Sequence, residues 1–247
     1  KDSIPEYLST HPLSETRIAD SRNRANQYPE KQYQDSFDYH LSRNIVMTDY
    51  SESPQKSKSY FESIINKGST SQIDAAKFGL AYSQIATNPQ AALTLLEDLL
   101  KKFPGKITIQ IVQARALHEN NQSKQAMQNL EILLARNPQN YPITDALAQL
   151  YLKNDLIDLY EQTLVKLSRT QEENPKVWYQ LAEAHGLAGN IVELHVARAE
   201  FFYLTNRLDT ALEQLNLALK KNKVEAMTAK IQKRMDEFYK LKEHPVF

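Results

Sequence analysis

From about residue 36 onward, apolar residues recur at the spacing of amphipathic helices, and short polar breaks interrupt them at regular intervals. The breaks carry Pro, Asn or Gly, which commonly mark the starts and ends of helices. They fall at Ser53-Pro54, Lys67-Gly68, Asn88-Pro89, Phe103-Pro104, Asn120-Asn121, Asn137-Pro138, Asn174-Pro175, Ala188-Gly189-Asn190 and Asn206. The pattern predicts a succession of short helices.

The N-terminal segment, residues 1–35, lacks this pattern. Three prolines interrupt it, so we expect it to be irregular or weakly helical. One short helix is predicted over residues 14–27, with Ser14 as its N-cap. The chain is therefore divided into the N-terminal segment and a helical region, residues 36–247.

Small residues recur in the helical region with a period of about 34 residues. Ala114, Ala148 and Ala182 follow one another at this period, and Gly79 precedes Ala114 by one residue more than a full period. A small side chain is expected at these positions because the two helices of a unit cross closely there. A bulky residue follows each of them three positions later: Tyr82, Leu117, Tyr151 and His185.

This period and this order of residue types are those of the tetratricopeptide repeat, a helix–turn–helix unit that stacks on its copies. We therefore expect an all-α fold, a tetratricopeptide-repeat α-solenoid with an irregular N-terminal segment.

The last repeat follows at half the usual spacing, since Ala199 comes only half a period after Ala182. The helix at about 190–205 is therefore predicted to serve as the second helix of one unit and the first helix of the next. The charged helix at about 223–242 is expected to cap the stack.

Composition excludes several classes of site and partner. Lys plus Arg and Asp plus Glu both total 30, so the net charge of zero favours neither nucleic acid nor an anionic membrane surface as a partner. The absence of Cys excludes a disulfide scaffold and a Cys-based metal site. The sequence lacks an apolar run of about 18 residues, so it is predicted not to span a membrane. Because the chain begins without Met, we expect a fragment or a processed product.

Catalytic motifs are absent from the 247 residues. The six histidines form no HExxH motif, and there is no Gly-rich phosphate loop or G-x-S-x-G elbow. His185, at a repeat position, is interpreted as a packing or capping residue, and His118 and His195 as half-exposed helix residues. An independent active site is therefore not expected.

Four tyrosines near the central repeats are candidates for binding a partner: Tyr141, Tyr151, Tyr160 and Tyr179. Rigid aromatic side chains that line a groove bind peptide at a low entropic cost. Packing in the core is the alternative for each of them, because aromatic residues at repeat positions usually serve the core.

The stretch STHPLSETRIADSRNRANQYP, residues 9–29, directly precedes the repeats. With them it resembles the C-terminal part of the periplasmic β-barrel assembly-enhancing proteases, a family of zinc metallopeptidases of the HExxH class. In that family a catalytic domain, closed by a His-Pro-x-x-x-x-Arg signature, precedes a tetratricopeptide domain. His11, Pro12 and Arg17 match the signature. Residues 1–35 are accordingly interpreted as the tail of the catalytic domain and a linker.

The resemblance implies roles for two of these residues in a full-length parent. His11 would lie close to the zinc, as an extra ligand or a transition-state donor, and Arg17 would hold the site together or pair with a carboxylate. A catalytic zinc needs three protein ligands, and the HExxH histidines and the glutamate ligand are absent here. We therefore expect this chain by itself to hold no zinc and to be proteolytically inert. The alternative is a simple turn before a helix, with Arg17 as a first-turn charge.

The resemblance also implies a function. The chain would be the protein-binding domain of a periplasmic zinc metalloprotease and chaperone. It would engage the outer-membrane β-barrel assembly machinery, the lipopolysaccharide-transport barrel protein and misassembled substrates.

The alternative is a generic cytosolic tetratricopeptide adaptor that binds peptides. An adaptor that grips carboxylates needs converging basic side chains, but those of the repeats do not recur at one register: Lys101, Lys102, Arg115, Arg136, Lys153 and Arg169.

Overall fold

The computed structural model describes residues 14–29, 36–68 and 70–243, and in these it contains thirteen helices and no strand. The chain divides into two compact units, residues 1–40 and 41–247. In the first unit, α1 spans Ser14–Ala25 and its side chains from Arg17 onward are exposed. The predicted short helix is confirmed, but Ser14 is its first helical residue and not the N-cap, and it ends two residues earlier than expected.

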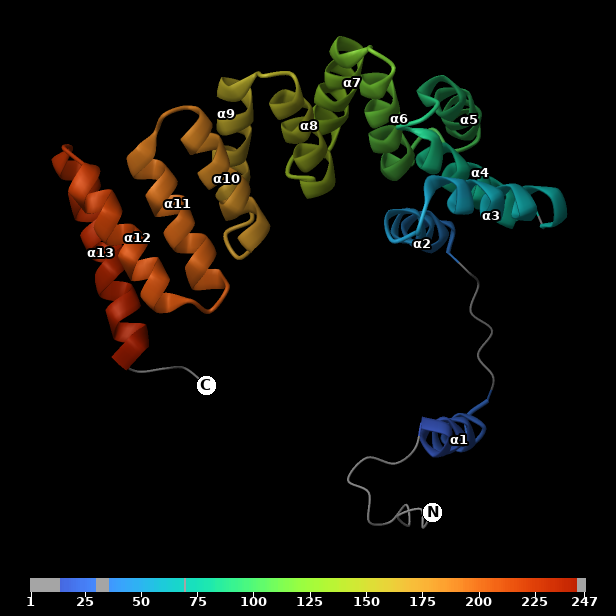
Figure 1. Ribbon diagram of the computed structural model, residues 1–247, viewed down its shortest axis with the longest axis horizontal. Helices are drawn as coiled ribbons and strands as arrows, with labels where there is room; N and C mark the ends of the chain where they lie inside the picture. The colour runs from blue at the N-terminus through green and yellow to red at the C-terminus, as the bar shows by residue number, and fades with distance from the viewer. Residues whose placement is uncertain (1–13, 30–35, 69, 244–247) are drawn as a thin grey trace. The chain divides into compact units, whose positions relative to one another are not determined.

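Short helices follow one another along the rest of the described chain (Figure 1). They are α2 (Phe37–Asp49), α3 (Pro54–Lys67), α4 (Thr70–Gln84), α5 (Pro89–Lys102), α6 (Ile107–Glu119), α7 (Ser123–Arg136), α8 (Tyr141–Lys153), α9 (Ile157–Ser168), α10 (Pro175–Leu187), α11 (Ile191–Leu204), α12 (Leu208–Lys221) and α13 (Glu225–Glu243). Every predicted break coincides with the start or the end of a helix. The fold is the expected all-α tetratricopeptide-repeat solenoid.

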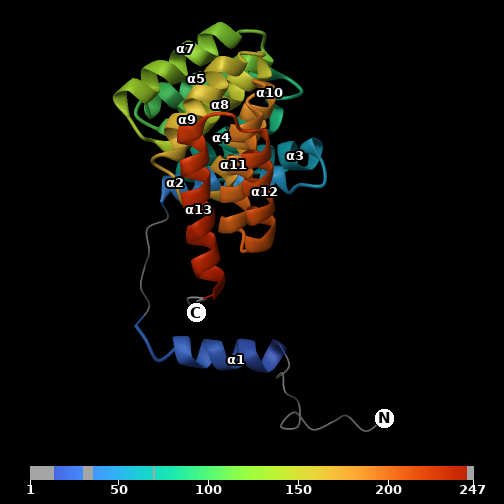
Figure 2. The same ribbon diagram turned by 90° about the vertical axis from the view of Figure 1, so that its left-hand side faces the viewer.

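Within the unit of residues 41–247 the helices form a curved row, with α4, α6, α8 and α10 on its inner side (Figure 1). Figure 2 views the same row from the end at which α13 lies. Each helix from α3 onward packs on its neighbour in sequence, and α6 also packs on α8. The first helices of successive units are therefore neighbours, although a whole repeat separates them in the sequence.

Three helices start with the same pair of residues, a polar N-cap followed by Pro. Ser53, Asn88 and Asn174 are N-caps whose side chains accept a backbone N–H of the first turn, and each is followed by Pro at the first helical position. The cap satisfies an amide that has no partner within the helix, and the ring of Pro fixes a helical φ at a position where no N–H is needed.

The turns that follow α6, α8, α10 and α11 share one conformation. Asn121, Asp155 and Gly189 recur at the period of the repeat and have positive φ values of 60°, 57° and 78°, and Asn206 follows half a period later with a φ of 58°. The next residue in each turn donates its N–H to the carbonyl of the bulky repeat residue: Gln122 to Leu117 at 2.8 Å, Leu156 to Tyr151 at 3.0 Å, Asn190 to His185 at 2.8 Å and Arg207 to Phe202 at 2.8 Å. This is the Schellman pattern, which satisfies the last carbonyls of the first helix. Because α11 ends in the same turn as α6, α8 and α10, it has the geometry of a first helix.

The small repeat residues lie in the core. Ala114, Ala148 and Ala182 are at most 5% exposed. At Gly79, a Cβ atom would lie 2.4 Å from two ring carbons of Phe61 on α3, which is closer than real atoms approach. The closest contact at Gly79 is therefore with the preceding helix, α3, whereas the sequence had led us to expect it with α5, the second helix of the same unit.

At the C-terminal end, α11 packs on both α10 and α12, as each helix from α4 to α12 packs on its two neighbours in sequence, and it ends in the turn of a first helix. Both observations agree with the prediction that α11 serves two units. The predicted capping helix is α13. Its Ile231 and Phe238 are buried against Leu215 and neighbouring residues of α12.

Arg234 of α13 links this helix to α11. Its Nε and Nη2 donate to the two carboxylate oxygens of Glu200 at 2.8 and 2.6 Å, and its Nη1 donates to Glu237 at 2.7 Å. The guanidinium also lies over the rings of Phe238 and Tyr203, 4.5 and 5.0 Å from their centroids. A bidentate pair of this kind fixes orientation as well as adding energy.

We predict that Gly79→Ala lowers the urea midpoint of unfolding by an amount equivalent to about 1–3 kcal/mol, because the added methyl group forces the ring of Phe61 to move. The matched control is Gly105→Ala, where a Cβ would meet no atom within 4 Å. Equal midpoints for the two variants would contradict this prediction, because they would show that the ring of Phe61 can move aside without lowering the free energy of unfolding.

Arg234→Gln is predicted to loosen α13, with a loss of local stability of about 2 kcal/mol, because Glu200 and Glu237 lose a charged partner. Hydrogen–deuterium exchange should then become faster in α13 and remain unchanged in α4 to α8. Lys242→Gln is the control, since it removes the exposed pair that also joins α13 to an earlier helix, at Asp209 of α12. Unchanged exchange in α13 of Arg234→Gln would contradict the assignment of this link.

Candidate functional site

The first helices of successive units are joined by polar contacts on one face. Lys153 of α8 pairs with Glu119 of α6 at 3.0 Å, and Tyr82 of α4 donates to Asp49 of α2 at 2.9 Å. We call the surface made by α2, α4, α6, α8 and α10 the first-helix face. These contacts connect helices along it that belong to different units.

The link from α8 to α10 uses Asp145. Its two carboxylate oxygens accept from Lys176 and Gln180 of α10, both at 2.9 Å. Gln180 is buried, and its own Oε1 has no hydrogen-bond partner. The carboxylate therefore holds the two helices together from a half-buried position.

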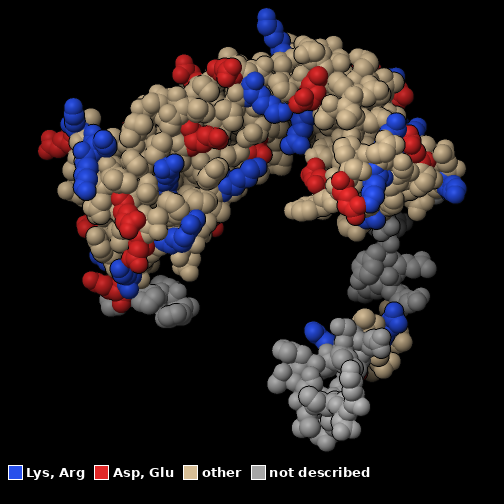
Figure 3. Space-filling view, in the orientation of Figure 1, with Lys and Arg blue, Asp and Glu red and all other residues tan. Residues whose placement is uncertain are grey.

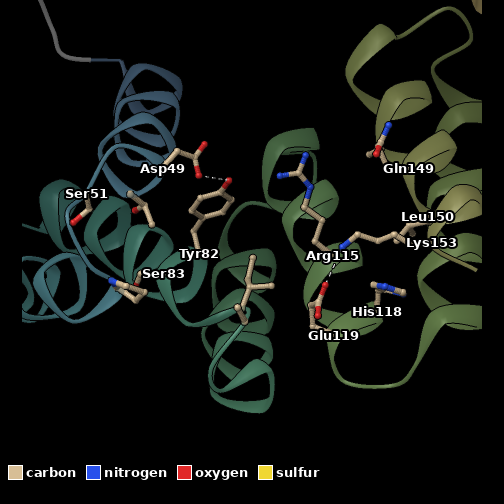
Figure 4. A pocket seen from close by; sticks show the side chains of 15 residues that line it. Asp49, Ser51, Tyr82, Ser83, Arg115, His118, Glu119, Gln149, Leu150 and Lys153 are labelled. Atoms are coloured by element: carbon tan, nitrogen blue, oxygen red, sulfur yellow. Dashed lines mark hydrogen bonds and ion pairs between the residues drawn. The ribbon is translucent and has the colours of Figure 1, made fainter. Parts of the chain in front are cut away.

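A cavity of about 600 Å³ opens on this face between α2, α4, α6 and α8 (Figure 4). Such a volume is typical of a binding pocket. Its polar lining comprises Thr48, Asp49, Ser51, Tyr82, Ser83, Arg115, His118, Glu119, Gln149 and Lys153, and its apolar wall comprises Pro54, Ile85, Ala86, Ala146 and Leu150.

Most charged groups of the cavity have a partner inside it. Glu119 neutralises Lys153, and Asp49 accepts the phenol hydrogen of Tyr82. Burial, together with the carboxylate of Asp49, raises the pKa of Tyr82 above its usual value, so the phenol stays neutral at physiological pH. The guanidinium of Arg115 interacts with the same phenol and opposes part of this rise in pKa, and it forms an ion pair with no carboxylate of the described residues.

Three described histidines, His118, His185 and His195, have the exposure that the sequence predicted. His118 lines the cavity half-exposed, with its Nδ1 2.8 Å from the hydroxyl of Ser123. His185 is buried, with its Nδ1 2.6 Å from Glu161, which confirms its interpretation as a packing residue. His195 is half-exposed beside Gln214.

Two of the four predicted tyrosines reach the surface. Tyr179 of α10 is 60% exposed, and its ring meets that of Phe201 edge to face, with 5.5 Å between the centroids. Leu187 lies two turns further along α10 and is 54% exposed. Tyr141 is half-buried, with the ammonium group of Lys176 6.0 Å from its ring centroid.

The other two tyrosines pack in the core, the alternative that the sequence left open. Tyr151 and Tyr160 are 6% and 0% exposed, and their hydroxyls donate to Glu131 at 2.8 Å and Glu183 at 3.1 Å. Burial, followed by these carboxylates, raises the pKa of both phenols well above the usual value. Their rings offer a partner almost no surface, and a role for them in binding stays a prediction.

Sequence reasoning missed two side chains of the cavity, Arg115 and Gln149, as candidates for binding. They directly follow the small repeat residues Ala114 and Ala148 and so occupy matched positions in successive units. The repeat alignment therefore carried a signal for them. Lys153 lines the same cavity. Two basic side chains, Arg115 and Lys153, therefore meet there although they occupy different positions within their repeats.

Of His11 and Arg17, only Arg17 lies in the described part of the chain. His11 lies outside the described residues, so its predicted role is untested, and Arg17 is an exposed residue of α1. The described part of the chain contains no group of three or more His, Asp or Glu side chains arranged for a metal ion. None of the helices in residues 14–29, 36–68 and 70–243 combines the length and apolar character needed to cross a membrane.

Charges of both signs are interspersed on the visible face of the solenoid (Figure 3). This agrees with a net charge of zero, and it leaves local groups such as Arg115 to decide which ligand chemistry the face favours.

Comparison with known proteins supports the fold and adds relatives. The tetratricopeptide repeat family matches residues 84–150. The chain is 29% identical over 242 residues to the β-barrel assembly-enhancing protease of Escherichia coli K12, and 27% identical over 241 residues to that of Yersinia pestis. Each alignment covers 97% of this chain and 49% or 50% of the relative. The chain thus spans about half the length of the curated relatives it matches.

Solved structures of tetratricopeptide proteins also align with the chain. A tetratricopeptide repeat protein of Parabacteroides merdae aligns over 84% of this chain and 88% of its own, with a TM-score of 0.46 and 16% identity. Taken together, the helix pairs, the repeated turns and the relatives identify the chain as a tetratricopeptide-repeat solenoid with homologues among the β-barrel assembly-enhancing proteases.

Proposed function

We propose that this chain is the protein-binding part of a larger β-barrel assembly-enhancing protease, and that its first-helix face holds the protein partner. The observation that carries the proposal is the cavity of about 600 Å³, which lies on the same face as the exposed Tyr179 and Leu187. Exposed apolar side chains beside a polar cavity are typical of surfaces that bind another chain.

The partners follow from the names of the relatives. A protein that enhances β-barrel assembly must meet either the assembly machinery of the outer membrane or barrels that have failed to assemble. We propose both as partners, including the lipopolysaccharide-transport barrel protein, and a periplasmic location, where these components meet. No observation favours the alternative of a cytosolic adaptor.

We assign the catalytic reaction to a part of the larger protease outside these 247 residues. A catalytic zinc needs three protein ligands and an open position, and the described residues do not build such a site. We propose that the parent is a zinc metalloendopeptidase in which His11 and Arg17 border the metal site. The solenoid would raise the effective concentration of a bound substrate at that site.

Binding through the first-helix face predicts where a partner can be crosslinked. We expect a photoreactive amino acid at Gln149 or Tyr179 to crosslink a purified outer-membrane β-barrel protein diluted from urea, or the purified barrel-assembly complex. The same amino acid at Ile132 of α7 or Leu217 of α12 should not, although these are 46% and 38% exposed. Crosslinks only at Ile132 or Leu217 would place the partner on another face.

The purified chain is predicted to leave casein intact in the presence of zinc, because the described residues supply no set of three metal ligands. The measurement is the release of soluble peptide over several hours, with a zinc protease of the thermolysin class as the positive control. Cleavage that a chelator abolishes would refute the assignment of catalysis to the missing part.

A further inference from the structure

We propose that the cavity between α2, α4, α6 and α8 binds one acidic side chain, Asp or Glu, within an extended segment of the partner protein. Arg115 and Gln149 are the groups that hold its carboxylate. This inference rests on the proposed function, since it specifies which chemistry the first-helix face selects.

Of the cationic and amide side chains that line the cavity, Arg115 and Gln149 take part in no ion pair with the described residues. Both line it, from α6 and α8, and both occupy the position after the small repeat residue. The guanidinium of Arg115 lies beside the neutral phenol of Tyr82 and forms an ion pair with no carboxylate of the described residues, and the amide of Gln149 makes no side-chain hydrogen bond there. Donors that have no charged partner of their own favour an acceptor that arrives with a ligand.

The ligand that fits these donors is a carboxylate. A guanidinium presents two parallel N–H groups whose spacing matches the two oxygens of a carboxylate, and a side-chain amide adds a further donor. The apolar wall, which includes Ile85 and Leu150, lowers the local dielectric and strengthens such contacts.

The other charged groups of the cavity, Lys153 and Asp49, also affect how strongly a ligand carboxylate binds. Lys153 is already neutralised by Glu119 at 3.0 Å, so it adds little attraction. Asp49 accepts a hydrogen bond from the phenol of Tyr82 and forms no ion pair with Arg115. A ligand carboxylate is therefore attracted by Arg115 and repelled by Asp49.

The continuity of the face indicates a side chain within a segment and not a chain end. From the cavity the face runs through the Asp145 contacts to α10, where Tyr179 and Leu187 are exposed. An extended segment that places its carboxylate at Arg115 can continue over these apolar side chains, at about 3.3 Å per residue. The expected ligand is thus a segment in which several residues separate an Asp or Glu from apolar or aromatic residues.

The experiment is a selection from a library of random dodecapeptides, each fused through its C-terminus to a display protein so that none carries a free terminal carboxylate. The purified 247-residue chain is the bait. We expect Asp or Glu to be enriched at one position of the selected peptides. A parallel library with free C-termini should show no further preference for a terminal carboxylate.

Variants then test the named residues with the tightest peptide selected. Arg115→Gln should weaken its binding about tenfold, and replacing its acidic residue by the matching amide should weaken binding by a similar factor. Asp49→Asn should tighten binding about threefold, because a repulsive charge is removed. Arg136→Gln, the same change on α7 outside this cavity, should leave the affinity unchanged.

The outcomes separate the inference from the proposed function. Peptides that bind without an acidic preference, or that bind Arg115→Gln as tightly as the unaltered chain, would overturn the inference and leave the protein-binding face in place. Selection of a terminal carboxylate only would also overturn it. If neither library yields a binding peptide and no crosslink forms at Gln149 or Tyr179, the proposed function itself fails.

Discussion

Close contact between helices at one small residue per unit is the constraint on which the solenoid depends. At Gly79 no Cβ atom can be accommodated against Phe61 unless the ring moves, and the alanines at the equivalent positions are buried almost completely. Interiors are packed too densely to absorb even one extra carbon at such a point. The spacing of the helices, and with it the position of every side chain on the first-helix face, follows from these contacts.

The turns set the direction in which each second helix leaves. One residue in the left-handed conformation ends α6, α8, α10 and α11, and the amide after it bonds the carbonyl of the bulky repeat residue. Because the same turn ends the first helices α6, α8 and α10 at the period of the repeat, these successive units present the same face. Its recurrence at the end of α11, only half a period after the turn that ends α10, explains how this helix can belong to two units.

Along the first-helix face, contacts between neighbouring helices engage most polar groups. Lys153 and Glu119 pair with each other, Asp145 joins α8 to α10, and Tyr82 is held by Asp49. These contacts give the face its rigidity and leave few groups for a ligand. The guanidinium of Arg115 forms no ion pair with the described residues, whereas Lys153 is already paired with Glu119. A ligand carboxylate can therefore bind Arg115 without breaking an internal ion pair.

The fold class, the repeat and most helix ends could be predicted from the amino-acid sequence, because the period, Pro and Asn act locally along the chain. The sequence also indicated the packing role of His185, since repeat positions serve the core. It did not determine which of Tyr151, Tyr160 and Tyr179 would be exposed, as burial depends on the neighbouring helix. Only the tertiary structure brought Arg115, Gln149 and Lys153 into one cavity, because side chains that belong to different repeats meet through helix packing and not through a shared register.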